Sequence, residues 1–302
     1  VIIGGGPAGC AAAALTARCK WKVLVIDRGM DNGFLGSLSN VSYFPGFPES
    51  ITGQELVKRM RRQSELVGVH FIADTVKTLS TASLPFKITT EFGKEFDAVS
   101  IVVATGAALR TNYLHGEKEF LGRGVSHDAL ADGPSVAKRT AAVVGRSKTA
   151  VTEALILSRF ADKIHFIIPS SKIEAEDKLV KQLERHKSIE LHYSTSLKKI
   201  NGSDHVSSIT IFTGGQEKEI PVAGAFTYVH EYQPTTGFLD KVVELAPGGA
   251  VKVSENLQTS FEGIFACGDV LCGRPQLPAV SAAQGLLAAM SVDKFLALKR
   301  GE

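Results

Sequence analysis

Cysteine is scarce in this chain: the 302 residues include only Cys10, Cys19, Cys267 and Cys272. So few cysteines exclude a secreted scaffold held by disulfides, and we expect a reducing cytoplasm as the compartment. The net charge is only +3 and no dense basic tract occurs, so we expect no nucleic acid and no membrane partner. No apolar run is long enough to span a bilayer.

The length and the apolar content point to a globular protein. Hydrophobic residues make up 44% of the chain, which is enough for substantial cores and predicts two domains. Val1 begins inside a strand pattern, so we expect that a few residues precede it.

A nucleotide-binding turn follows the first residues. The apolar run at residues 1–3 leads into a G-x-G-x-x-G turn and then an Ala-rich helix pattern. The first glycine permits the tight turn, the second lets a pyrophosphate approach the backbone, and the third allows the helix to pack closely on the strand. The motif consists of Gly4, Gly5, Gly6, Pro7, Ala8 and Gly9.

A second strand pattern, residues 22–26, ends at Asp27, 18 residues after Gly9. An acid at this place accepts hydrogen bonds from the ribose hydroxyls of a bound dinucleotide. Two of the four cysteines, Cys10 and Cys19, fall in the Ala-rich helix pattern, where we expect buried packing residues without a redox role.

Four further segments resemble the low-molecular-weight thioredoxin reductases. They are the F-P-G-F run with its following G-x-E-L at 40–56, V-V-A-T-G at 102–106, residues 116–126, and Gly268-Asp269 with an Ala-rich helix pattern behind it. The resemblance covers nearly the whole chain. It implies an α/β fold of two Rossmann-like, three-layer dinucleotide-binding domains and a homodimer. The FAD-binding domain would be split, 1–110 with 244–302, around an inserted NADPH-domain-like domain at 111–243.

The resemblance also implies which residues contact FAD. Asp269 would bond the ribityl chain, and Gln276 and Leu277 stand where the family has an Arg-Gln pair beside the flavin. Backbone amides of a helix beginning near Pro278 can still stabilise a negative charge there, because a helix dipole acts regardless of side chain. The other implied cofactor-binding residues are Gly4, Gly6, Pro7, Ala8, Gly9, Asp27, Arg28, Gly33, Asn40, Ala104, Thr105, Gly106 and Gly268.

Two family features are missing. Asp128 and Ala131 stand at the two positions of the redox C-x-x-C, and neither side chain can exchange thiols with a disulfide. Without neighbouring thiols, the simplest interpretation of residues 127–132 is a solvated loop.

In the second nucleotide turn, Arg146-Ser147-Lys148 follows Gly145 in place of small residues, and Pro169-Ser170-Ser171 replaces the basic pair that holds the NADPH 2′-phosphate. We therefore expect NADPH not to be the cofactor.

One feature is gained. Cys267 and Cys272 replace an alanine or serine and an acid of the family's A-x-G-D-V-x-D segment. A turn starting at Gly268 would bring both sulfurs near each other and near the flavin, so we predict that this pair is catalytic. We expect a lowered pKa for Cys272, because Arg274 and a helix N-terminus follow it. The alternative is that both cysteines only fill space.

This combination resembles the diflavin-linked disulfide oxidoreductases of cyanobacteria, which implies a second FAD in the former NADPH region. Tyr228 or Tyr232 could stack on it, although core packing would explain both rings equally. The predicted function is FAD-dependent oxidation or reduction of a small-molecule or protein dithiol or disulfide, without a metal. Two alternatives stay open, a ferredoxin-linked flavin oxidoreductase and a non-catalytic FAD-binding paralogue.

Overall fold

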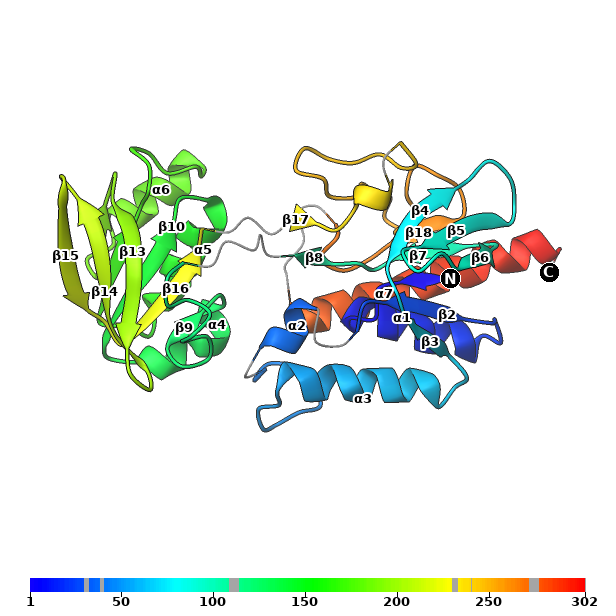
Figure 1. Ribbon diagram of the computed structural model, residues 1–302, viewed down its shortest axis with the longest axis horizontal. Helices are drawn as coiled ribbons and strands as arrows, with labels where there is room; N and C mark the ends of the chain where they lie inside the picture. Colours follow the sequence, from blue (N-terminus) through cyan, green and yellow to red (C-terminus); the bar gives the residue numbers. More distant parts are fainter. Residues whose placement is uncertain are drawn as a thin grey trace. The chain divides into compact units, whose positions relative to one another are not determined.

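The computed structural model describes residues 1–29, 33–38, 41–108, 114–229, 233–239, 241–271 and 277–301 (Figure 1). The chain divides into two compact units. Unit 1 comprises Val1–Leu109 with Tyr232–Glu302, and unit 2 comprises Arg110–Glu231. Within unit 1, β17 (Gln233–Pro234) pairs with β8 (Ala107–Ala108).

Unit 1 is built on a five-stranded parallel sheet of order β18-β7-β1-β2-β3. Strands β1, β7 and β18 carry only Ile, Val, Phe and Ala and are fully buried, as expected for strands covered on both faces. The strands are β1 (Ile2–Ile3), β2 (Leu24–Asp27), β3 (His70–Ala73), β7 (Ile101–Val103) and β18 (Ile264–Ala266).

Helices and a small antiparallel sheet complete unit 1. α1 (Pro7–Arg18) packs closely on α7 (Pro278–Arg300), because a Cβ on Gly285 would lie 2.1 Å from the carbonyl oxygen of Ala8 (Figure 1). The remaining elements are α2 (Phe34–Ser37), α3 (Gly53–Glu65), the 3-10 helix Gly237–Leu239, and a meander of β4 (Val76–Ser80), β5 (Phe86–Thr90) and β6 (Glu95–Ala98).

Unit 2 repeats the plan with a parallel sheet of order β12-β11-β10-β16-β9. These strands are β9 (Val125–Ser126), β10 (Thr140–Gly145), β11 (Lys163–Ile167), β12 (Ile189–His192) and β16 (Gly224–Tyr228). An antiparallel sheet of β13 (Ser196–Gly202), β14 (Val206–Thr213) and β15 (Gln216–Pro221) shares a core with one face. The helices are α4 (Ala129–Asp132), α5 (Lys148–Leu157), α6 (Asp177–Glu184) and the 3-10 helix Gly133–Val136. Among the described residues, no helix has both the length and the apolar character needed to cross a bilayer.

Candidate functional site

The predicted cofactor residues of unit 1 gather at one edge of its parallel sheet. The turns that follow β1, β7, β18 and β2 all leave from the carboxyl ends of the strands, where ligands of such sheets bind. Two of these turns touch, because a Cβ on Gly4 would lie only 2.3 Å from the carbonyl oxygen of Ala104. With its φ of +105°, Gly4 is therefore required as glycine for two independent reasons.

The N-terminus of α1 is open toward this edge. Gly6 is the N-cap residue and no side chain caps the helix, so the first amides of α1 keep free donors for a ligand. A Cβ on Gly6 would meet nothing within 4 Å, whereas one on Gly9 would lie 1.8 Å from the carbonyl oxygen of Gly4. Gly9 thus serves the packing of α1 on β1, and Gly6 leaves room beside the amides for a phosphate. Pro7 and Ala8 form the first turn of the helix.

Asp27 stands at the end of β2 with its carboxylate held by two backbone amides. Gly5 N donates to Oδ2 at 2.6 Å, and Gly29 N donates to Oδ1 at 2.8 Å. Each carboxylate oxygen keeps acceptor capacity beyond one bond, so this fixed geometry suits the hydroxyls of a ribose.

The Gly268-Asp269 turn is fixed to α7 by two hydrogen bonds. The amide of Gly268 donates to Oε1 of the buried Gln284 at 2.8 Å, and Ser281 Oγ donates to Asp269 Oδ1 at 2.8 Å. Burial raises the pKa of Asp269 above its usual range, and the Ser281 bond partly opposes that rise. Leu277 is the N-cap residue of α7, and no described side chain caps this helix either, so no cap competes with a ligand for its first amides among the described residues.

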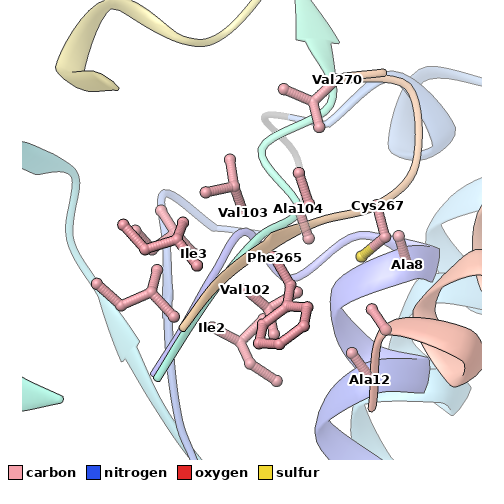
Figure 2. Close-up of a cluster of buried hydrophobic side chains, with 14 of the residues drawn as sticks. Ile2, Ile3, Ala8, Ala12, Val102, Val103, Ala104, Phe265, Cys267 and Val270 are labelled. Carbon is pink, nitrogen blue, oxygen red and sulfur yellow. The ribbon is translucent and has the colours of Figure 1, made fainter. Parts of the chain in front are cut away.

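Cys267 follows β18 directly and belongs to the core of unit 1. Its side chain is 0% exposed, and Figure 2 shows the sulfur pointing toward the start of α1, beside Ala8. The thiol is free, and burial raises its pKa to about 12. A thiol in this position is protonated at neutral pH and is closed to an external reagent.

The other site residues predicted from the sequence lie on the same sheet edge, near Asp27 and α2, or outside the described residues. Ala104, Thr105 and Gly106 line the same sheet edge after β7, where Thr105 Oγ1 donates to the carbonyl oxygen of Thr235 at 2.8 Å. Gly33 is the N-cap residue of α2, and Arg28 is exposed beside Asp27. Asn40, Tyr232, Cys272 and Gln276 lie outside the described residues.

The expectation of two buried cysteines in α1 is confirmed for Cys10 and wrong for Cys19. Cys10 is 1% exposed and its thiol donates to the carbonyl oxygen of Gly5 at 3.1 Å. Cys19 is exposed because it is the C-cap residue, at which the helix leaves the core. Both are free thiols.

The corresponding nucleotide turn in unit 2 is built differently. Ser147 is the N-cap residue of α5, and its hydroxyl accepts from Ala150 N at 3.4 Å. The side chains on either side form exposed ion pairs, Arg146 Nε with Glu174 Oε2 at 3.5 Å and Lys148 Nζ with Glu176 Oε1 at 2.6 Å. Side chains therefore occupy the place that Gly6 leaves open in unit 1.

The segment at the family's redox-cysteine positions is not the solvated loop that we expected. Asp128 caps the short helix α4, with Oδ1 accepting from Leu130 N and Ala131 N at 2.9 Å each. Ala131 is buried, so α4 covers a core instead of standing in solvent. Asp132 Oδ2 accepts from Ser126 Oγ at 2.7 Å, and burial is the main reason that its pKa lies above the usual range.

Sequence reasoning missed a set of polar groups behind this segment. Glu153 on α5 accepts from Ala129 N at 2.8 Å and from the hydroxyl of Tyr228 at 3.0 Å, and burial raises its pKa. His127 Nδ1 lies 3.0 Å from the carbonyl oxygen of Thr227, and its buried Nε2 has no hydrogen-bond partner among the described residues. In the sequence, only the polar residues that follow β9 and β16 could have indicated this set. Tyr228 itself is 7% exposed within the core of unit 2.

Known proteins are similar to this chain over nearly its whole length. Residues 1–285 match the family model described as pyridine nucleotide-disulphide oxidoreductase. The thioredoxin reductase of Aquifex aeolicus is 38% identical over 99% of this chain and 94% of its own length.

Solved structures agree with this match. Thioredoxin reductase from Giardia duodenalis superposes with a TM-score of 0.93 at 28% identity, covering 98% of this chain and 97% of the other. One from Gloeobacter violaceus has 34% identity and a TM-score of 0.58, with 99% and 94% covered. The predicted fold class of two Rossmann-like dinucleotide-binding domains is thereby confirmed.

Proposed function

Because the chain belongs to the pyridine nucleotide-disulphide oxidoreductase family and is a thioredoxin reductase-like oxidoreductase, we propose that it exchanges electrons between a Cys267/Cys272 pair and FAD. The observation that carries this proposal is that no thiol stands where the resemblance places the redox cysteines. Asp128 caps a helix, Ala131 is buried, and no cysteine occurs between Cys19 and Cys267. Thiol chemistry in this chain therefore needs the cysteines of unit 1.

The residues at the sheet edge of unit 1 fit FAD. The uncapped N-terminus of α1 with open space at Gly6 suits the pyrophosphate, and Asp27 suits the ribose. Asp269 and the uncapped N-terminus of α7 suit the ribityl chain and the flavin end. When bound, FAD supplies a carrier for two electrons beside the Gly268-Asp269 turn.

The burial of Cys267 assigns different tasks to the two sulfurs. With 0% exposure, Cys267 cannot meet a substrate thiol, so a mixed disulfide with the substrate must form at Cys272. In the direction that we favour, a substrate thiolate attacks Cys272 of the oxidised pair and breaks the Cys267–Cys272 bond. The second substrate thiol then displaces Cys272. The substrate loses two electrons and two protons and leaves Cys267 and Cys272 as a dithiol. FAD, if held at the adjoining sheet edge, would supply the acceptor for the two electrons.

We propose that NADPH is not the electron donor, because Pro169-Ser170-Ser171 follows β11 in place of the basic pair that would hold its 2′-phosphate. We further propose that a second FAD, which carries no 2′-phosphate, takes this region, as the resemblance to the cyanobacterial diflavin-linked oxidoreductases implies. Its phosphates would replace Glu174 and Glu176 as the partners of Arg146 and Lys148. Stacking on Tyr228 would require its buried ring to move, and stacking on Tyr232 stays a prediction.

A second candidate function is supported by the same burial. A free thiol in the core with a pKa of about 12 is also what a non-catalytic FAD-binding paralogue would contain. In that case Cys267 packs against α1 and the flavin never responds to thiols. A ferredoxin-linked enzyme, the remaining alternative, would use the same FAD site without needing either sulfur.

We further propose a cytoplasmic homodimer. Exposed apolar side chains on α7 support the dimer: Leu286, Leu287 and Met290 are 45%, 53% and 62% exposed within one turn and a half of helix. The exposed free thiol of Cys19 fits a reducing compartment.

The test of the proposed function is an anaerobic titration of the FAD-loaded protein, first with dithiothreitol and then, on fresh protein, with NADPH. We expect dithiothreitol to bleach the flavin absorbance and NADPH to leave it unchanged. Stoichiometric bleaching by NADPH would contradict the proposal. No bleaching by any dithiol would favour the non-catalytic paralogue.

A further inference from the structure

Two histidines and a glutamate meet on one face of the parallel sheet of unit 2. His165 lies in β11, and Glu190 and His192 lie in the neighbouring strand β12. The strands are parallel, with His165 opposite Glu190 and Ile167 opposite His192. Because side chains alternate along a strand, Glu190 and His192 emerge on the same face, and the register brings His165 to them.

The two imidazole nitrogens lie close to each other, and each lies close to a different oxygen of the Glu190 carboxylate. His165 Nδ1 lies 3.0 Å from His192 Nε2, His165 Nδ1 lies 3.6 Å from Glu190 Oε2, and His192 Nε2 lies 3.5 Å from Glu190 Oε1. Two ligands bound at about 2.0–2.1 Å to a tetrahedral Zn²⁺ stand about 3.4 Å apart. One ligand atom from each of the three residues lies within 4.8 Å of the other two. Binding of a zinc ion would replace the hydrogen bond between the two imidazoles, with release of its proton, and would turn one carboxylate oxygen toward both nitrogens.

The surroundings prepare the imidazoles for a cation. His165 is 8% exposed and His192 is half-buried, so both imidazoles are partly shielded from water. Lys163 Nζ binds Glu190 Oε2 at 2.8 Å, which orients the carboxylate and leaves Oε1 facing His192. The charge of Lys218 also reaches both histidines. Lys163 is half exposed, so solvent screens its repulsion of an ion.

We propose that His165, Glu190 and His192 bind one Zn²⁺ per chain, with a water molecule as the fourth ligand. Two imidazole nitrogens and one carboxylate oxygen are ligands that zinc prefers, and three protein ligands leave one position open. Glu190 is half exposed, which provides an entry path for the ion. The ion joins β11 to β12, the edge strand of the sheet, and so stabilises unit 2. The sequence alone predicted no metal.

The test is equilibrium dialysis of the full-length, FAD-loaded protein against ZnCl₂ after removal of metals with a chelator, with bound zinc measured by elemental mass spectrometry. We expect saturation at one zinc per chain and a rise of the thermal unfolding midpoint on binding. Glu190→Gln and His192→Gln should each weaken binding by at least about tenfold and remove the thermal shift. The Glu190 side chain is 48% exposed, so we expect Glu190→Gln to fold. This variant therefore tests the site even if His192→Gln does not fold.

Two control variants separate this site from other zinc ligands in the chain. His205→Gln removes an exposed histidine of unit 2, and Cys19→Ser removes the exposed thiol of unit 1. Both should bind zinc like the unaltered protein. The proposal is overturned by an absence of saturable binding, by unchanged binding in Glu190→Gln, or by loss of binding in Cys19→Ser.

Discussion

The amide of Gly268 donates a 2.8 Å hydrogen bond to Oε1 of Gln284, and both groups are buried. This bond ties the turn after β18 to the middle of α7. The turn carries Cys267 on one side and Asp269 on the other, so this bond, together with the bond from Ser281 to Asp269, positions the proposed redox and cofactor residues.

Replacing Gln284 should therefore loosen this turn. Gln284→Ala leaves the buried Gly268 amide without a partner, and we expect the free energy of unfolding to fall by about 1–3 kcal/mol. FAD should also dissociate faster, because one of the two hydrogen bonds that hold the Gly268-Asp269 turn on α7 is lost. Urea denaturation and flavin release measure the two effects. Gln182→Ala, on the exposed side of α6, should change neither, and equal losses in both variants would contradict this role.

The space beside Gly6 allows a test of the cofactor site that does not disturb the fold. The backbone of Gly6 is extended, and a Cβ there would meet no protein atom within 4 Å. Gly6→Ala should leave the stability of the FAD-free protein unchanged. It should weaken FAD binding by at least about tenfold, or about 1.4 kcal/mol, because the methyl group occupies the approach of the pyrophosphate.

The matched control is Gly237→Ala, which also adds a methyl group in open space but far along the chain from the nucleotide turn. Fluorescence titration with FAD should give this variant the affinity of the unaltered protein. Unweakened binding in Gly6→Ala would show that the phosphates lie elsewhere.

The burial of Asp132 makes a prediction about pH. Burial raises the pKa of this carboxyl group in the folded chain, so the folded state binds more protons than the unfolded state once the pH exceeds about 4. Stability contributed by Asp132 is then lost as the pH rises through the raised folded-state pKa. Asp132→Asn removes this loss and should flatten the fall in unfolding free energy between pH 4 and 7.

Urea denaturation at several pH values measures that slope. Asp162→Asn, at an exposed position of the same unit, should keep the slope of the unaltered protein. If the unfolding free energy of Asp132→Asn fell more steeply with pH than that of the unaltered protein, the raised pKa of Asp132 would not be the cause of the fall.

The sequence predicted those parts of the fold that depend on neighbouring residues. The strand, glycine turn, helix and second strand up to Asp27 form one continuous segment, so its spacing alone determines where the nucleotide edge lies. The exposure of Cys19 could not be read from composition, because it depends on whether the helix ends one residue earlier or later.

Features created by distant segments were not predictable. Whether the Cys267 sulfur points toward the flavin or toward α1 depends on how β18 pairs with β7 and how α1 packs on the sheet. Likewise, 27 residues separate His165 from His192, and only the register of β11 and β12 brings their nitrogens to 3.0 Å. Gln284 looks like an ordinary helix residue until its partner at Gly268 is known.

The number of flavins per chain tests the proposed second site. Heat-released flavin, measured against protein concentration, should give about two FAD per chain, because each unit contains a parallel sheet of the kind that binds dinucleotides and we propose one FAD beside each sheet. A ratio of about one would restrict FAD to unit 1. Arg146→Ala combined with Lys148→Ala should lower the ratio by about one, while Gly237→Ala should leave it unchanged.

The most direct test of the proposed electron path compares Cys272→Ser with Cys19→Ser, both loaded with FAD to the level of the unaltered protein. Under anaerobic conditions, dithiothreitol should bleach the flavin of Cys19→Ser at the normal rate and fail to bleach that of Cys272→Ser. Equal bleaching in the two variants would contradict the account, because electrons would then reach the flavin without the Cys267/Cys272 pair.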